Sequence, residues 1–325
     1  ELEIVHAGTG MNLGEASRPG YLDTHKGRMA LIGLATTFTP MSRAGAARPD
    51  MRGRPGLNAL RVERRYQIGP ALFQTLREAA PTLGSRTPSN EKAPLRLFGV
   101  TLQPGDETRV VESVNLRDEE RILREIRNAA KLSDYVIVNS HSHEPGNDST
   151  TPPDWLVPFI KKCLDAGAAT YIVHGPHQLR GIEIYKGKPI FYSLGNFIFQ
   201  NETIDPMPAD NYETYNLPDT ALAADLYDAR FKEGTVGFPS NPVWYESVIA
   251  VPTFKGSAIA DLKLYPIDLA QKAPRSQRGT PRLADDETGR KIIERIAQLS
   301  TPFGTTIVYE KGIGVWKSTG SASPE

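Results

Sequence analysis

Histidine is the residue type whose spacing in this chain points most clearly to chemistry. Four of the six histidines lie between residues 141 and 177: His141, His143, His174 and His177. Neutral imidazole is the commonest protein ligand for transition metals, and the ligands of one ion come from segments that converge in space. The cluster therefore favours a metal site. The alternative is that single histidines cap helices or fill polar gaps at the edge of a sheet.

Glu144 directly follows His143 and adds a carboxylate to this group. A carboxylate beside imidazoles either orients one of them through a hydrogen bond or works as a general acid or base. The simpler interpretation is an exposed carboxylate on a loop.

Arginines gather in a second segment, residues 42–65. Arg43, Arg48, Arg52 and Arg54 stand among glycines and prolines without periodicity, which indicates a long inserted surface loop. Guanidinium groups pair with carboxylates and phosphates through two parallel hydrogen bonds, so we predict that these four arginines bind an anionic substrate. The alternative is a solvated basic loop, balanced by the acidic residues of 200–232.

The elements around the histidines follow from the apolar pattern. Residues 29–35 are continuously apolar, as in a strand buried on both faces, and residues 134–139 form a similar β-branched run. A helix is predicted from Asp118 to about residue 130. A second helix follows Asp154, which we expect to cap it, and residues 170–173 predict another buried strand.

Strand, helix and strand in this order predict a parallel βαβ unit. The carboxyl ends of parallel strands meet at one edge of the sheet, where ligands bind in open α/β sheets. Because both strands run directly into histidines, the two histidine pairs should lie together.

The rest of the chain completes an α/β pattern. Residues 181–193 predict a β-hairpin, and residues 200–246 form a long, acidic, tyrosine-containing segment that we interpret as a lid-like loop. Strands near 248–251, 260–265 and 305–309 and a helix near 287–299 are predicted beyond it.

Composition limits the classes of protein that fit. The chain has 325 residues, enough for a large core, with 38 basic and 38 acidic residues. This balance argues against nucleic acid as a partner. The single cysteine, Cys163, falls in an apolar helical pattern and predicts a core residue rather than a disulfide. No apolar run is long enough to predict a membrane span.

The segment from His174 to Phe199 reads HGPHQLRGIEIYKGKPIFYSLGNFIF. It resembles the signature of the CapA family, the bacterial capsule and poly-γ-glutamate synthesis proteins related to calcineurin-like metallophosphatases. Residues 138–144 (VNSHSHE) resemble that family's strand and histidine motif, and residues 7–16 resemble a segment that follows its Asn-His motif. The resemblance covers most of the chain and is weakest beyond residue 200.

The resemblance implies one domain over residues 1–325 with a layered α/β sandwich and a mixed central sheet. It implies a metal-dependent hydrolase that uses two divalent ions of manganese, iron or zinc, with His141, His174 and His177 as ligands. His143 and Glu144 are then predicted to be catalytic, and Asn196 joins the four arginines as a substrate-binding residue. The substrate would be an anionic polymer or small molecule with an amide, ester or phosphoester bond.

One departure from the family pattern stands out. The family's site also uses an N-terminal Asp motif and an Asn-His motif, and this chain has no Asn-His dipeptide. We therefore expect that sequence is missing upstream or that the site is incomplete. The resemblance further implies export to the periplasm or cell envelope, with the cytoplasm as the alternative. Two other functions fit the same residues: a non-catalytic accessory that binds capsule polymer, and a scaffold whose histidines are structural.

Overall fold

The structure is a computed structural model that describes residues 4–317. Contacts divide the chain into two compact units, one formed by the residues up to Asn58 together with those from Leu123 onward, and the other by Ala59–Ile122. The larger unit contains all four clustered histidines. The prediction of a single domain stays a prediction.

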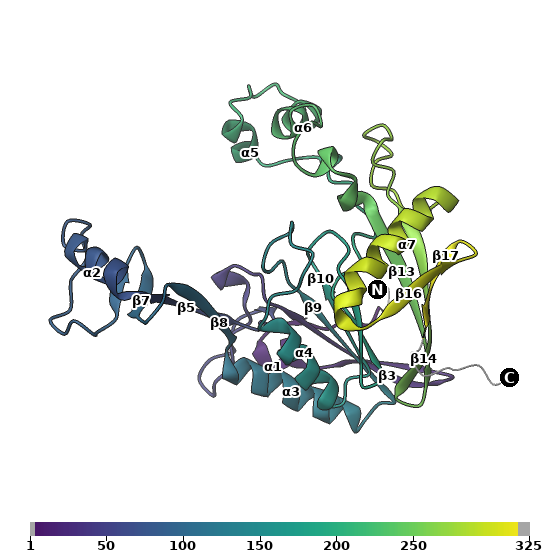
Figure 1. Ribbon diagram of the computed structural model, residues 1–325, viewed down its shortest axis with the longest axis horizontal. Helices are drawn as coiled ribbons and strands as arrows, with labels where there is room; N and C mark the ends of the chain where they lie inside the picture. The colour runs from purple at the N-terminus through teal and green to yellow at the C-terminus, as the bar shows by residue number, and fades with distance from the viewer. Residues whose placement is uncertain (1–3, 318–325) are drawn as a thin grey trace. The chain divides into compact units, whose positions relative to one another are not determined.

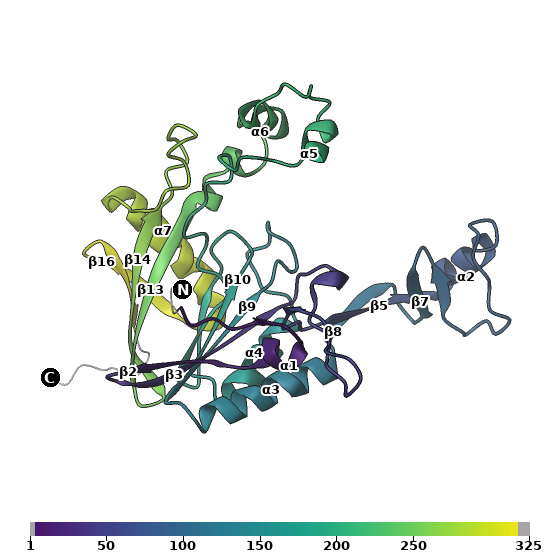
Figure 2. The same cartoon turned by 180° about the vertical axis from the view of Figure 1, so that it is seen from behind.

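A six-stranded sheet forms the centre of the larger unit, in the order β11-β12-β10-β9-β3-β2. The strands are β2 (Gly20–Thr24), β3 (Gly27–Ala35), β9 (Tyr135–His141), β10 (Thr170–His174), β11 (Ile182–Tyr185) and β12 (Lys188–Phe191). The four inner strands are parallel, and the edge strands β2 and β11 are antiparallel. Figure 2 shows β2 and β3 side by side at one edge. The predicted mixed central sheet and α/β class are confirmed.

Two helices lead into the strands that end in histidines. The helix α3 (Leu116–Ala130) precedes β9, and α4 (Leu156–Asp165) connects β9 to β10. Cys163 lies buried in α4 as expected. The predicted cap at Asp154 is wrong, because the N-cap of α4 is Trp155 and makes no side-chain cap hydrogen bond. A backbone turn begins the helix instead, with Leu156 N donating to Pro153 O over 3.0 Å.

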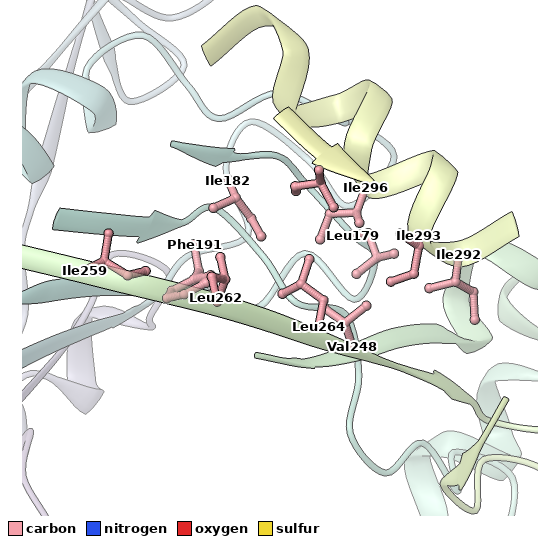
Figure 3. Packing of buried hydrophobic residues seen from close by; sticks show 11 residues of the cluster. Leu179, Ile182, Phe191, Val248, Ile259, Leu262, Leu264, Ile292, Ile293 and Ile296 are labelled. Atoms are coloured by element: carbon pink, nitrogen blue, oxygen red, sulfur yellow. The ribbon is translucent and has the colours of Figure 1, made fainter. Parts of the chain in front are cut away.

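A second, antiparallel sheet packs in the larger unit, and α7 (Asp286–Ser300) lies along it (Figure 1). Its strands are β13 (Glu246–Lys255), β14 (Ala258–Asp268), β15 (Arg282–Leu283), β16 (Thr306–Glu310) and β17 (Ile313–Lys317). Figure 3 shows the core between this sheet, the β11–β12 hairpin and α7. Ile182 and Phe191 of the hairpin share this core with Leu262 and Leu264 of β14 and with Ile292, Ile293 and Ile296 of α7. Because β12 pairs with β10, the core contacts that hold the hairpin also hold the edge of the central sheet next to β10.

The segment that the sequence predicts as a lid contains short helices. They are α5 (Ala209–Thr214), α6 (Ala223–Phe231) and the 3-10 turns η2 (Phe238–Ser240) and η3 (Pro242–Tyr245). A motion of this segment as a lid stays a prediction.

The arginine segment also has local structure. It contains β4 (Gly56–Leu57), which pairs with β1 (Thr9–Gly10) beside α1 (Leu13–Ser17). The 3-10 turn η1 (Pro40–Ser42) ends at the segment's first residue, and β5 (Val62–Ile68) begins before its last. The smaller unit has its own sheet, in the order β6-β7-β5-β8, with α2 (Pro70–Ala79). Its strands are β5 (Val62–Ile68), β6 (Leu95–Leu97), β7 (Val100–Pro104) and β8 (Arg109–Val114). A further 3-10 turn, η4 (Thr301–Phe303), follows α7.

Candidate functional site

The two strands of the βαβ unit end in histidines that lie next to each other. β9 and β10 are parallel, and His141 and His174 are partners in their register. The Nδ1 atoms of the two rings are 3.2 Å apart. The prediction that the strand ends bring these residues together is therefore confirmed.

His143 and His177 extend this pair into a cluster of four rings. His143 Nε2 lies 3.0 Å from His141 Nε2, and the rings of His143 and His177 have centroids 5.2 Å apart. All four imidazoles thus lie in one group at the carboxyl edge of the central sheet. Sequence spacing alone selects all four members.

Backbone conformation allows the two histidine loops to approach this closely. Gly175 has φ +121°, and a Cβ atom on it would lie 2.9 Å from the backbone oxygen of Ser142. Ser142 N donates to His174 O over 2.8 Å, which joins the loops just beyond the strand ends. His177 itself adopts φ +62°, which turns the chain back toward the cluster.

Burial and repulsion between the rings lower the pKa of three of the imidazoles, those of His141, His174 and His177. Burial is the main cause that lowers the pKa of His141 to about 4, and the neighbouring His174, His143 and His177 lower it further. Burial also lowers the pKa of His174 and that of His177. At neutral pH these three rings are therefore neutral and present lone pairs, which is the form that binds a metal ion.

The carboxylate of Glu144, next to His143 in the chain, is held by three hydroxyl groups. Its Oε2 accepts hydrogen bonds from Thr36, Thr37 and Ser142 at 2.8, 2.9 and 2.8 Å. Burial raises the pKa of Glu144, but these hydrogen bonds outweigh it and the pKa is lowered. The carboxylate is therefore ionised and held. Thr36 and Thr37 were not predicted as part of the site, although two polar residues directly after an apolar strand are a usable signal.

The loop that follows His143 is fixed by two further residues that the sequence does not single out. Arg180 is fully buried and donates to the backbone oxygens of Glu144, Gly146 and Ser149. Gln178 donates to the backbone oxygen of Asn147, whose side-chain oxygen lies 2.7 Å from His143 Nδ1. Both residues belong to the segment whose letters carry the family resemblance, but nothing in their type or spacing indicates these contacts.

Asn196 lies against His177, and aromatic rings complete the surroundings of that histidine. Asn196 Oδ1 is 2.8 Å from His177 Nδ1, and its Nδ2 donates to the backbone oxygens of His177 and Trp244. The rings of Phe199 and Phe238 each have centroids 5.5 Å from that of His177. The substrate-binding role predicted for Asn196 stays a prediction, and its amide is engaged in the protein itself.

The four arginines of the inserted segment make contacts of different kinds. Arg48 pairs with Asp50 over 3.0 Å with both side chains exposed, and Arg54 Nε donates to the backbone oxygen of Arg43. Arg43 Nε is buried and finds no hydrogen-bond partner within the described residues. Arg52 is exposed. Anion binding by this group stays a prediction.

The histidine cluster offers donor atoms suited to a metal ion, but these atoms are not arranged as a complete coordination shell. Within residues 4–317, no three His, Cys, Asp or Glu side chains are placed to hold one ion as they stand. The ring nitrogens instead face each other at 3.0 and 3.2 Å. Neutral imidazoles that converge from two loops match the ligand type of iron and zinc sites. Over the same residues no helix is both long and apolar enough to cross a membrane.

Comparison with known proteins yields one family and several relatives. Residues 1–201 match the family described as bacterial capsule synthesis protein PGA_cap. An uncharacterised protein of Sinorhizobium fredii, y4sH, is 41% identical over 326 residues, which cover 97% of this chain and 70% of the relative. The PGA biosynthesis protein CapA of Bacillus subtilis is 43% identical over 83 residues, covering 25% of this chain and 21% of that protein. A probable polyglutamine synthesis accessory protein of Mycobacterium tuberculosis is 38% identical over 71 residues, covering 22% of this chain and 18% of that protein.

Proposed function

The chain belongs to the PGA_cap family of bacterial capsule synthesis proteins, and from that membership we propose that it is a metal-dependent hydrolase whose metal is held by His141, His174 and His177. The metal is a divalent transition ion, manganese, iron or zinc, and we propose two ions per site. The substrate is an anionic polymer or a small anionic molecule linked to capsule or poly-γ-glutamate metabolism. The same membership leads us to propose export to the periplasm or cell envelope, with the cytoplasm as the alternative.

One observation carries this proposal. His141 and His174 are register partners at the carboxyl ends of adjacent parallel strands, and burial lowers the pKa of both. His141 is half-buried and His174 is exposed, so an ion from solution can reach both rings, and the neutral imidazoles offer it lone pairs. A metal ion is the partner that satisfies such a set of lone pairs together.

Different residues of the chain would have different roles in hydrolysis. A bound divalent ion supplies Lewis-acid polarisation of the bond to be cleaved. His143, with Nδ1 against Asn147, is the imidazole that we propose to hold or move a proton at Nε2. Glu144 holds the loop of His143 through its three hydroxyl contacts, and the catalytic role predicted for it from sequence stays a prediction. The exposed arginines of residues 48–54 would attract the anionic substrate.

The test measures metal content and hydrolysis on the same preparations. We expect elemental mass spectrometry to give about two transition-metal ions per chain, with metal-dependent cleavage in a panel of poly-γ-glutamate, ester and phosphoester substrates. His141→Ala and His174→Ala should lose metal and lower the rate by more than about 100-fold, since each removes a donor. His25→Ala, an exposed histidine in the turn between β2 and β3, is the matched control and should leave both unchanged. Full activity in both cluster variants would refute the proposal.

A second function is favoured by different observations. The relative from Mycobacterium tuberculosis is described as an accessory protein, and Arg48 and Arg52 are exposed. These features fit a non-catalytic protein that binds capsule polymer. This alternative predicts polymer binding without turnover and the same polymer affinity in metal-free protein.

A further inference from the structure

Asn196 makes three polar contacts that together fix its amide. Nδ2 donates to His177 O and to Trp244 O, each over 2.9 Å. These two carbonyls use both amide hydrogens, and turning the amide over would place its oxygen against two other oxygens. The oxygen Oδ1 must therefore face His177 Nδ1, 2.8 Å away.

This orientation determines which nitrogen of His177 carries the proton. Because Oδ1 can only accept, His177 Nδ1 must donate and holds the hydrogen. The neutral ring then keeps its lone pair on Nε2. A hydrogen bond from one ring nitrogen to an oxygen is the usual way in which a protein orients a metal-ligating histidine.

The position of Asn196 is itself fixed from two sides. The preceding residue, Gly195, has φ +79°, and a Cβ atom on it would lie 2.6 Å from Glu246 O. Ser247 Oγ and Val248 N both donate to Leu194 O, which joins this corner to the start of β13. Packing of Phe199 and Phe238 around the His177 ring further limits its rotation.

We propose that Asn196 is a positioning residue that fixes His177 in the tautomer with Nδ1 protonated and Nε2 free to bind metal, and that ties this histidine to Trp244 at the end of the 200–246 segment. This inference rests on the proposed function only in giving Nε2 a metal to bind. The tautomer exists in the metal-free protein and is measured there. In this role Asn196 orients a metal ligand and does not contact the substrate directly.

The experiment determines the tautomer of His177 by NMR of the ¹⁵N-histidine-labelled, metal-free full chain, with the His177 signals assigned through His177→Asn. We expect the wild type to show Nδ1 protonated and Nε2 bare. Asn196→Ala should lose this preference and bind Zn²⁺ about 10- to 100-fold more weakly, as expected for loss of a residue that orients a ligand. Asn211→Ala, in α5, is the control and should change neither quantity.

Two results would overturn the proposal: His177 protonated on Nε2 in the wild type, or an unchanged tautomer in Asn196→Ala. If Asn196→Ala fails to fold, the wild-type spectrum decides the tautomer on its own, because protonation on Nε2 there would overturn the proposal. Absence of hydrolysis with the expected tautomer would refute the proposed function and leave this inference standing.

Discussion

Gly175 determines how closely the two histidine loops approach, because its missing side chain leaves room for the backbone of Ser142. The nearest atoms to a Cβ at this position would be Ser142 O, C and N, at 2.9 to 3.1 Å. All three are backbone atoms of Ser142, which follows the last residue of β9 and donates its N–H to His174 O at the end of β10, so they cannot move independently. The geometry of the whole cluster thus depends on one residue without any polar side chain.

Replacing Gly175 by alanine should therefore destabilise the protein and spread the histidines apart. The φ of +121° alone costs an alanine about 1–3 kcal/mol, and the clash with Ser142 adds to it. We expect the free energy of unfolding, measured with denaturant, to fall by at least about 2 kcal/mol, with weaker Zn²⁺ binding in the fraction that folds.

Gly304→Ala provides the comparison for this substitution. Gly304 also has positive φ, +71°, but a Cβ atom there meets nothing within 4 Å. It should cost about 1–2 kcal/mol and leave Zn²⁺ affinity unchanged. Equal effects of the two substitutions on Zn²⁺ affinity would show that the approach to Ser142 is not what shapes the site.

At the scale of elements, the loop after β9 is held by a side chain from the far side of the βαβ unit. Arg180 lies six residues beyond the end of β10, and its guanidinium donates hydrogen bonds to three backbone oxygens between residues 144 and 149. Burial lowers its pKa to about 10, so the group is still protonated and donating at neutral pH. The Glu144 carboxylate raises the pKa against this effect of burial, and the three backbone oxygens accept the hydrogen bonds of the guanidinium. The loop that carries Asn147, and through it His143, is thus fixed without secondary structure of its own.

Arg180→Met tests this support, because methionine fills much of the same space without donors. Leaving buried carbonyls unsatisfied costs about 1–3 kcal/mol each, so we expect the free energy of unfolding to fall by about 3 kcal/mol or more. Amides of residues 144–149 should exchange with solvent faster, as read by hydrogen exchange. Arg282→Met, at an exposed arginine of β15, should change neither measurement. Unchanged exchange in Arg180→Met would contradict the supporting role.

The sequence predicts the elements that have a strong apolar pattern and misses those that do not. The βαβ unit, the hairpin β11–β12 and α7 follow from periodicity, and with them the meeting of His141 and His174. The sheet of the smaller unit and β17 were not predicted, because strands such as β5 (VERRYQI) and β8 (RVVESV) mix charged and apolar residues without clear alternation. The contacts of Asn147, Gln178 and Arg180 also escaped prediction, since they depend on where irregular loops fold back.

For the whole molecule, charge acts locally rather than through a net field. The chain has 38 basic and 38 acidic residues, so attraction of a polyanion must come from a patch and not from overall charge. Arg48 and Arg54 belong to the larger unit, which also holds the histidine cluster, and with Arg52 they are exposed. Exposed charges of this kind are screened strongly by salt. Salt dependence therefore separates their contribution from that of buried groups.

The combined variant Arg48→Gln, Arg52→Gln, Arg54→Gln should bind poly-γ-glutamate about 10-fold or more weakly at low salt, because each exposed pairing contributes up to about 1 kcal/mol. Binding is measured by titration calorimetry at low and at high ionic strength, and the difference from wild type should largely vanish at high salt. The same three changes at Arg86, Arg117 and Arg282, which are also exposed, keep the net charge equal and should have a much smaller effect. Equal losses in the two triple variants would show that total charge, rather than the arginine segment, attracts the polymer. A specific loss together with intact metal-dependent cleavage of a small ester would assign the segment to substrate capture and the histidines to the chemical step.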